Sequence, residues 1–416
     1  MTVMAQRLGS PLDSVLEVTD SAGRVLPRAL ARPVWQTFVT LNDPGSLQSG
    51  MRIDSWTALG IGDRVMVGNE IVQVQELPKN PDADIQFRSY RGVRIGYEGT
   101  TPEAHAMGTT VYKVELHKPG RTFPPNGMPL FTIPYCNDDG GQNFGKDSFL
   151  MFEAREDGEF LVRIRDIRGL QGKTYAYRLT LQEPQPDFTL SVDPKNPNIP
   201  RGGAAPVTVT ATRLDGFEGP IDVELADLPA GVTASPARIL AGAPTATLVV
   251  RAAPDANLAG GFARFRARGR AEIGGAVRER WADLGADDLV AGIALAELPE
   301  LEVASVEPKD LVLEPGGQAP ISVAIARRRG FAGRVPVEVR NLPFGVMVPD
   351  VGLNGILITE EETSRTFHVA VDPKTAPLQQ MLYLVARIET NAGAIEHASV
   401  PIRLKVVAKK TQVSQR

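Results

Sequence analysis

The chain has 416 residues, and its 45 Lys and Arg nearly balance its 49 Asp and Glu, for a formal net charge of −4. This balance excludes the strongly basic surface with which proteins hold nucleic acids or anionic membranes. The single cysteine excludes an internal disulfide and a cysteine-based zinc site. The 40 glycines and 33 prolines, spread without a collagen period, indicate many tight turns between short strands. We therefore expect an all-β chain of about three domains.

The N-terminal segment shows no signal peptide, and the sequence lacks the run of about 18 apolar residues that a membrane-spanning helix needs. Residues 7–23, RLGSPLDSVLEVTDSAG, predict a turn, a strand and a hairpin. Residues 1–5 are typical of the end of a strand, so we expect the chain to begin inside a fold.

The next segment, residues 36–120, is predicted to form a small β unit of its own. Residues 62–75 alternate on both sides of a Gly-Asn turn, as a β-hairpin does, and residues 85–88 and 111–116 predict two more strands. Aromatic side chains of this segment are candidates for stacking on a sugar ring, and packing in the core explains them equally well. These candidates are Trp35, Trp56, Tyr90 and Tyr97.

Residues 91–111 carry the pattern R-G…G-T-x-x-x-x-H-x-x-G-T-x-V, in which the histidine is His105. The pattern resembles a loop of small barrels in phage structural proteins, and this resemblance implies a structural loop. Catalysis would need a nucleophile and an orienting acid within hydrogen-bond reach of His105, and no G-x-S-x-G or comparable elbow accompanies it. We expect His105 to hold the loop through a hydrogen bond.

An acidic, glycine-rich turn follows this segment, with Asp147 a few residues later. Calcium takes six to eight oxygen ligands, which such a turn can supply. The alternative, which the turn chemistry favours, is that these side chains cap turns through their own backbone. Cys136 precedes the turn, and neighbouring carboxylates should raise the pKa of its thiol, which disfavours a reactive thiolate. The candidate calcium ligands on the turn are Asn137, Asp138, Asp139 and Asp147.

Residues 1–35 and 121–185 together resemble the bacterial pre-peptidase C-terminal domain, a small jelly-roll-like β-sandwich found beside secreted proteases and other exported enzymes. The resemblance rests on the R-L-G-S-P-L-D-S start, the N-D-D turn, the later D-S, the D-G-E-F-L-V-R strand and the closing Y-A-Y-R-L. It implies that Asp13 lies near the acidic turn, as a fifth candidate calcium ligand. It also implies strands upstream of residue 7. Without them one sheet edge stays open, so we expect edge-strand pairing with another chain or a homodimer.

Two tandem copies of one domain are predicted at 187–298 and 299–410. The Val-acid-Pro motif at 192–194 recurs at 306–308, the Leu-Pro-x-Gly-Val turn at 228–232 recurs at 342–346, and 264–268 resembles 383–387. Period-two alternation within each copy predicts half-buried strands. We expect two Ig-like β-sandwiches without the disulfide, and the repeated turn resembles that of bacterial Ig-like modules.

Two charged segments of the first copy have competing interpretations. Alternating arginines predict one solvated strand face, with binding of an acidic polymer as the alternative. These are Arg264, Arg266, Arg268 and Arg270. An extra segment at 281–289 predicts a surface loop, or a ligand loop built on Asp283, Asp287 and Asp288.

The sequence thus predicts a non-catalytic, all-β chain: a jelly-roll-like sandwich with an inserted small β-barrel, two Ig-like sandwiches and a disordered tail at 411–416. The resemblances imply an extracellular or cell-envelope protein that serves as a spacer, adhesion or substrate-targeting part, with a polysaccharide or protein ligand. The alternative is an auxiliary segment of a secreted peptidase or hydrolase with a site in the insertion.

Overall fold

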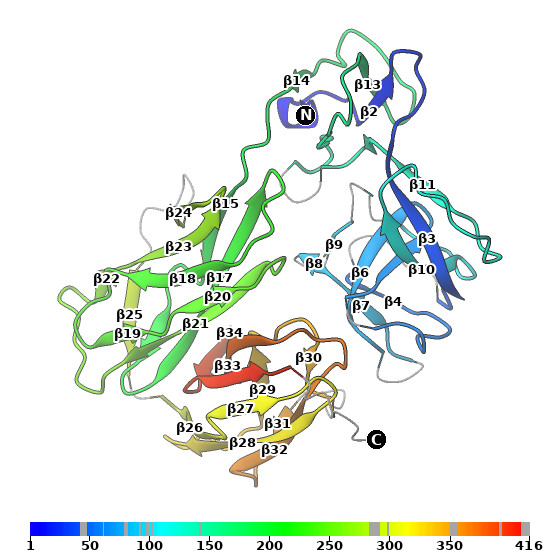
Figure 1. Ribbon diagram of the computed structural model, residues 1–416. Helices are drawn as coiled ribbons and strands as arrows, with labels where there is room; N and C mark the ends of the chain where they lie inside the picture. The colour runs from blue at the N-terminus through cyan, green and yellow to red at the C-terminus, as the bar shows by residue number, and fades with distance from the viewer. Residues whose placement is uncertain are drawn as a thin grey trace, which may run out of the picture. The chain divides into compact units, whose positions relative to one another are not determined.

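The computed structural model describes residues 1–41, 48–60, 62–78, 82–90, 93–96, 100, 103–140, 144–282, 292–297, 299–349, 356–390 and 393–408. The described chain is all-β, as expected, and divides into two compact units, Met1–Pro184 and Gln185–Arg416 (Figure 1). The first unit contains a short 3-10 helix, Gln6–Leu8. Its strands are β1 (Thr2–Met4), β2 (Ser14–Asp20), β3 (Pro27–Phe38), β4 (Gly50–Met51), β5 (Arg64–Val67), β6 (Glu70–Glu76), β7 (Ile85–Phe87), β8 (Ser89–Tyr90), β9 (Val93–Arg94), β10 (Thr110–His117), β11 (Phe131–Pro134), β12 (Cys136–Asn137), β13 (Phe160–Asp166) and β14 (Arg178–Thr180).

The largest sheet of the first unit, which we call the inserted sheet, has the order β11-β3-β10-β5-β6-β7-β4 (Figure 1). The predicted Gly-Asn hairpin is present as β5 and β6, with Val67 opposite Glu70. The inserted sheet extends beyond 36–120 at both ends, because the 12-residue strand β3 pairs with β10 on one side and β11 on the other. Alternating Val, Ile and Met side chains of these strands fill its core.

β8 pairs with β9 in a separate two-stranded sheet. The other strands of the first unit form a small sandwich, which we call the first sandwich. One layer is the sheet β12-β2-β13 and the other contains β1 and β14. The N-terminal residues form the short strand β1: it pairs with β14, and Val3 donates its N–H to the carbonyl oxygen of Ser148. Val3 and Leu16 are fully buried between the layers.

The second unit consists of two sandwiches, which we call repeat 1 and repeat 2. Repeat 1 contains β15 (Asp187–Asp193), β16 (Asn198–Pro200), β17 (Ala204–Leu214), β18 (Ile221–Ala226), β19 (Val232–Ala234), β20 (Ala237–Ile239), β21 (Thr245–Ala252), β22 (Phe262–Arg264), β23 (Arg266–Ile273), β24 (Ala276–Trp281) and β25 (Gly292–Ala296). Repeat 2 contains β26 (Leu301–Glu307), β27 (Asp310–Leu313), β28 (Gln318–Arg327), β29 (Val335–Arg340), β30 (Val346–Met347), β31 (Ile356–Ile358), β32 (Ser364–Val371), β33 (Leu378–Thr390), β34 (Gly393–Ala398) and β35 (Ile402–Val406).

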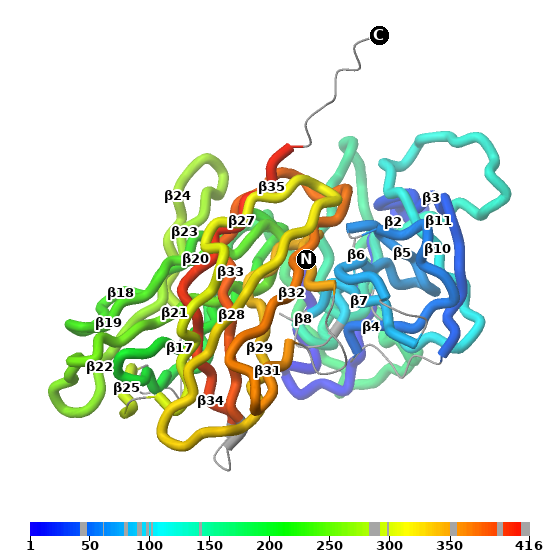
Figure 2. The backbone as a smooth tube through the Cα atoms, turned by 90° about the horizontal axis from the view of Figure 1, so that it is seen from below, coloured from blue at the N-terminus to red at the C-terminus, as the bar shows by residue number. Residues whose placement is uncertain are grey.

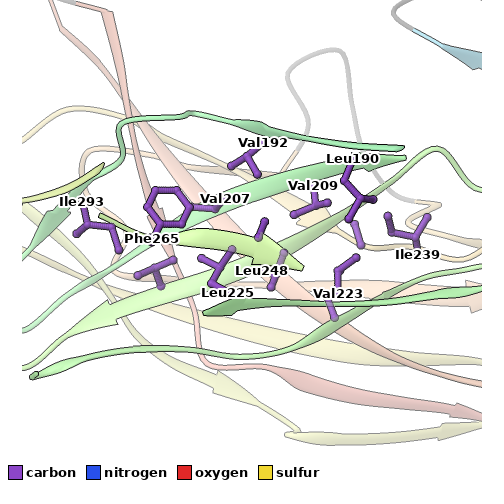
Figure 3. Close-up of a cluster of buried hydrophobic side chains, with 14 of the residues drawn as sticks. Leu190, Val192, Val207, Val209, Val223, Leu225, Ile239, Leu248, Phe265 and Ile293 are labelled. Carbon is purple, nitrogen blue, oxygen red and sulfur yellow. The ribbon is translucent and has the colours of Figure 1, made fainter. Parts of the chain in front are cut away.

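Repeat 1 packs the sheet β15-β17-β21-β19 against the sheet β20-β18-β23-β24, and the short sheet β16-β25-β22 completes it. Alternate residues of β17, β18 and β21 point inward, so that side chains such as Val209, Val223 and Leu248 interdigitate with Phe265 (Figure 3). This core has no disulfide, and its stability comes from burial of branched aliphatic side chains.

Repeat 2 has the same plan, with the sheet β26-β28-β32-β30 facing a sheet that contains β29, β33 and β35 (Figure 2). The ladders correct one detail of the sequence alignment. Arg266 lies opposite Ala226, and Tyr383 lies opposite Arg340, which is the counterpart of Ala226. Tyr383 therefore corresponds to Arg266 and not to Arg264, because the strand register rather than local sequence similarity sets the equivalence.

His397 on β34 lies opposite Ala386 and is 4% exposed, and burial lowers the pKa of its imidazole to about 4. A neutral buried histidine stabilises repeat 2 fully above the unfolded pKa of about 6.5, and this contribution is lost as the pH falls toward 4. We expect a loss of about 3 kcal/mol across this window. Amide hydrogen exchange of β33 and β34 at pH 7 and pH 4, corrected for the intrinsic rate, measures it. In His397→Leu the pH-dependent part of the loss should be absent, and an equal loss in both proteins would contradict the assignment to His397.

Candidate functional site

The structure assigns Asp147, a predicted calcium ligand, to the N-terminal turn. Its side chain is fully buried, and its carboxylate accepts hydrogen bonds from the backbone N–H groups of Ala5 (2.9 Å) and Gln6 (2.7 Å) and from Arg7 Nε (2.6 Å). Burial alone would raise the pKa of Asp147, but the hydrogen bonds from Arg7 and the backbone outweigh it and lower that pKa. Asp147 thus caps the 3-10 helix, whose own first residues offer no side-chain cap.

The other acidic residues of the turn do lie together. Burial first, and then the charges of Asp138 and Asp13, raise the pKa of Asp139, so these three carboxylates interact electrostatically. The Asn137 side chain is used locally: Nδ2 donates to the carbonyl oxygen of Asp139, and Oδ1 accepts from Phe149 N–H. Among the described residues, no group of three or more His, Cys, Asp or Glu side chains is arranged to hold a metal ion. Calcium binding at this turn stays a prediction.

Of the four aromatic candidates for sugar stacking, the structure describes the side chains of two. Trp35 and Trp56 pack, partly buried, against the core of the inserted sheet. Tyr97 and the side chain of Tyr90 lie outside the described residues. Two indole rings that share a core with Val39 and Leu59 leave only part of their faces for a sugar.

A buried ionic cluster, which we call the Glu70 cluster, connects the hairpin to the loop that carries His105. The Glu70 carboxylate binds Arg94 Nε at 2.7 Å and His105 Nε2 at 3.0 Å, and it accepts the backbone N–H of Glu103 at 2.8 Å. Arg94 Nη2 also donates to the carbonyl oxygen of Glu103 at 2.7 Å. All three charged or titratable side chains are at least 96% buried. The guanidinium and carboxylate therefore hold the loop onto β6 from inside the fold.

The Glu70 cluster gives His105 the structural role expected from the sequence, with a partner that the motif did not reveal. Burial opposes ionisation of Glu70, but hydrogen bonds from His105 and Arg94 outweigh it, so the pKa of Glu70 is lowered. The arginine involved is Arg94 rather than Arg91 of the quoted pattern. The signal that could have identified it is the glutamate directly after the Gly-Asn turn. An acid on the same face as the buried Val72 and Val74 needs a cationic partner.

Cys136, next to the acidic turn, is partly buried. Burial, together with the charges of Glu17 and Asp138, raises the pKa of its thiol. The direction agrees with the expectation from the sequence and opposes a nucleophilic role.

The contact between the two repeats is the second arrangement of interest, and its centre is Asn341. Asn341 has a left-handed backbone (φ 65°), and its side-chain amide pairs with the backbone of Thr247 as a strand would. Thr247 N–H donates to Asn341 Oδ1 at 2.7 Å, and Asn341 Nδ2 donates to the Thr247 carbonyl oxygen at 2.8 Å. An amide supplies both the donor and the acceptor that the backbone of β21 needs at Thr247, which β19 does not reach.

An apolar cluster accompanies this hydrogen-bonded pair. It consists of Ala204 and Val249 of repeat 1 with Tyr383, Val385 and Ala398 of repeat 2. All five side chains are nearly inaccessible to solvent. The outer face of the sheet β15-β17-β21-β19 therefore meets the outer face formed by β33 and β34, and the repeats are joined face to face.

The corresponding outer face of repeat 1 is charged. Ladder positions place Arg266, Arg268 and Trp281 where repeat 2 has Tyr383, Val385 and Ala398, respectively. Ala267, Gly269 and Ala271 point into the core, so Arg266, Arg268 and Arg270 form a solvated face, as expected. Arg264, predicted on the same face, lies instead on β22 of another sheet. The arginines are paired with acids: Arg266 with Asp227 at 2.6 Å, Arg270 with Glu279 at 3.0 Å and Arg268 with Glu224. Arg266 also stacks on the Trp281 ring at 4.0 Å.

The proposed ligand-loop residues Asp283, Asp287 and Asp288 lie outside the described residues.

Comparison with protein-family models finds no match, and comparison with curated proteins finds none either. Solved structures with local similarity include a protein of unknown function from Porphyromonas gingivalis, which is 18% identical over 53% of this chain and 99% of that chain, with a TM-score of 0.18. Domains 4–9 of the surface layer protein SbsC are 12% identical over 84% of this chain and 47% of that chain, with a TM-score of 0.22. Fibronectin(III)-like modules of Clostridium thermocellum CbhA are 12% identical over 55% and 98%, with a TM-score of 0.17. At these scores the similarities carry no argument about function.

In the part of the chain that the structure describes, no helix is long and apolar enough to cross a membrane.

Proposed function

We propose that this chain is a non-catalytic accessory protein whose second unit is a stiff spacer. The observation that carries the proposal is the face-to-face contact of the repeats, in which the Asn341 amide pairs with Thr247 beside a buried apolar cluster. A flexible array would need only a linker between its sandwiches, whereas this contact orders side chains from both repeats. The buried charges of the first unit support the non-catalytic role. The described side chains of Glu70, Arg94 and Asp147 are bound to structural partners.

We further propose that the first sandwich is a pre-peptidase C-terminal domain, on the sequence elements quoted above. The chain would then belong to a secreted or cell-surface bacterial protein and would position a polysaccharide or protein ligand. The ligand would contact the inserted sheet, where the indole rings of Trp35 and Trp56 are only partly buried against the core.

The stiffness of the repeat pair can be measured directly. Spin labels at Glu272→Cys and Glu361→Cys, two exposed positions on different repeats, in a Cys136→Ser background would report the inter-repeat distance by pulsed dipolar spectroscopy. We expect a single narrow distribution in the otherwise native chain. In Asn341→Asp we expect a clearly broadened one, because a carboxylate accepts the Thr247 N–H but repels its carbonyl oxygen, at a cost of about 1–3 kcal/mol.

The matched control is Asp227→Asn, the reverse exchange at the corresponding left-handed position of repeat 1, where Asp227 binds Arg266. This variant should leave the distance distribution unchanged. A broad distribution in the native chain would contradict the spacer proposal, whatever the variants show.

The alternative, an auxiliary segment of a secreted hydrolase with a site in the insertion, has one observation in its favour: His105 and Glu70 form a hydrogen-bonded histidine–carboxylate pair. Against it, the Glu70 carboxylate is also bound to Arg94 and the Glu103 N–H, and both side chains are buried. Turnover of casein or a p-nitrophenyl ester by the full chain, lost in a folded His105→Gln variant, would favour the hydrolase.

A further inference from the structure

β13 lies at the edge of the sheet β12-β2-β13 among the described strands. Val162 lies opposite Val18, and the Val18 N–H donates to Tyr135 on the other side of β2. In an antiparallel ladder, directly opposite residues point their backbone groups either toward each other or both away. The N–H and C=O groups of Val162, and by alternation those of Phe160 and Ile164, therefore point out of the sheet edge.

The apolar layer beneath this edge is incompletely covered. The inward side chains of β13, Phe160, Val162 and Ile164, pack against the core of the first sandwich but stay partly exposed, whereas Val3 and Leu16 in the same core are fully buried. The segment from β13 to just past β14 also carries several exposed large apolar side chains. These are Leu161 (43%), Ile167 (46%), Leu170 (50%), Tyr177 (51%) and Leu181 (60%). An additional strand beside β13 would cover apolar surface and satisfy an open row of backbone groups.

The charges on the outer face of β13 select among the strands that could occupy this edge. Arg163 and Arg165 point to solvent, and the Arg163 side chain is 50% exposed, with Glu17 as a partner at 3.7 Å. A second copy of β13 pairing antiparallel about its central residue would place Arg163 opposite Arg163 of the second copy, and like charges in opposite positions repel. The two arginines instead complement acidic residues on an incoming strand.

We propose that the β13 edge binds an extended segment of another polypeptide by strand addition, with apolar residues of that segment facing Phe160, Val162 and Ile164 and acidic residues facing Arg163 and Arg165. This interaction goes beyond the spacer function, which resides in the second unit, and does not depend on it. It also narrows the two alternatives from the sequence, edge pairing and homodimer, to edge pairing with a different, acidic strand.

Two synthetic peptides of seven residues, matching the length of β13, test the proposal on the full chain. One alternates Val with Glu and the other alternates Val with Lys. We expect the Glu peptide to bind about tenfold more tightly than the Lys peptide by fluorescence anisotropy of a labelled end, because two cross-strand charge pairs change from attractive to repulsive. Equal binding of both peptides, or binding of neither, would overturn the proposal.

Two variants locate the site. In Arg163→Glu/Arg165→Glu the preference should reverse toward the Lys peptide, and an unchanged preference would show that the peptide binds elsewhere. Val162→Pro removes an N–H that points to the open edge rather than to β2, so it should weaken the Glu peptide about tenfold or more while the ladder to β2 survives. If Val162→Pro unfolds the first sandwich, the Arg163→Glu/Arg165→Glu variant alone decides whether the peptide binds at the β13 edge. A concentration-dependent dimer that is lost in Val162→Pro would favour self-pairing and contradict the proposal.

Discussion

Arg94→Met should destabilise the inserted sheet by about 3–5 kcal/mol, the largest effect we expect from a single substitution in this chain. The substitution leaves the Glu70 carboxylate buried with His105 and a backbone N–H but without its cationic partner. Urea unfolding followed by the fluorescence of Trp35 and Trp56 measures the loss, in a Trp281→Phe background that removes the signal of the second unit.

The double variant Arg94→Met/Glu70→Gln should recover most of this loss, because the uncompensated charge is then gone. The surface control is Arg238→Met in repeat 1, measured by the fluorescence of Trp281 in a Trp35→Phe/Trp56→Phe background. Arg238 binds Asp222 at 2.5 Å, but both side chains are more than half exposed, so the loss should stay below about 1 kcal/mol. If Arg94→Met and Arg238→Met cost the same, the Glu70 cluster does not support the loop as we infer.

The second large effect is expected for Asp147→Asn, at about 2–4 kcal/mol in the first sandwich. The substitution keeps the shape but removes the charge that accepts hydrogen bonds from Ala5, Gln6 and Arg7. Because the pKa of Asp147 is lowered in the folded chain, its contribution is present above the unfolded pKa of about 4 and is lost as the pH falls below it. Hydrogen exchange of residues 1–20 as a function of pH measures both effects.

Asp139→Asn is the matched control, since it makes the same chemical change a few residues earlier, on the acidic turn, with the opposite expected sign. The pKa of Asp139 is raised by burial and by the charges of Asp138 and Asp13, so removing its charge should leave stability unchanged or increase it. A clear loss of stability in Asp139→Asn would instead indicate a bound cation. A calcium-induced increase in Tm, present in the native chain and absent in Asp139→Asn, would then support the predicted calcium site.

The sequence identified residues of the candidate site but did not identify the partners that they bind. The motif around His105 correctly predicted a hydrogen-bonded structural histidine, because the spacing of Gly, Thr and His describes a loop. It did not predict Glu70, which lies 35 residues earlier on another strand. In the same way, proximity in sequence groups Asp147 with the acidic turn, whereas its carboxylate binds residues 140–142 positions away.

The sequence by itself determined the all-β class, the two Ig-like repeats and the solvated arginine face, because period-two alternation and turn chemistry act over a few residues. The sequence also showed that the Leu-Pro-x-Gly-Val turn is repeated, but it did not show that the residues preceding the two copies have different partners. Asp227 and Asn341 occupy the same left-handed position after equivalent strands, yet Asp227 binds Arg266 and Asn341 binds Thr247 of the neighbouring repeat. Only the tertiary structure decided between these partners, because a side chain's hydrogen bonds depend on which sheet face is packed against it, and that packing joins strands about 100 residues apart.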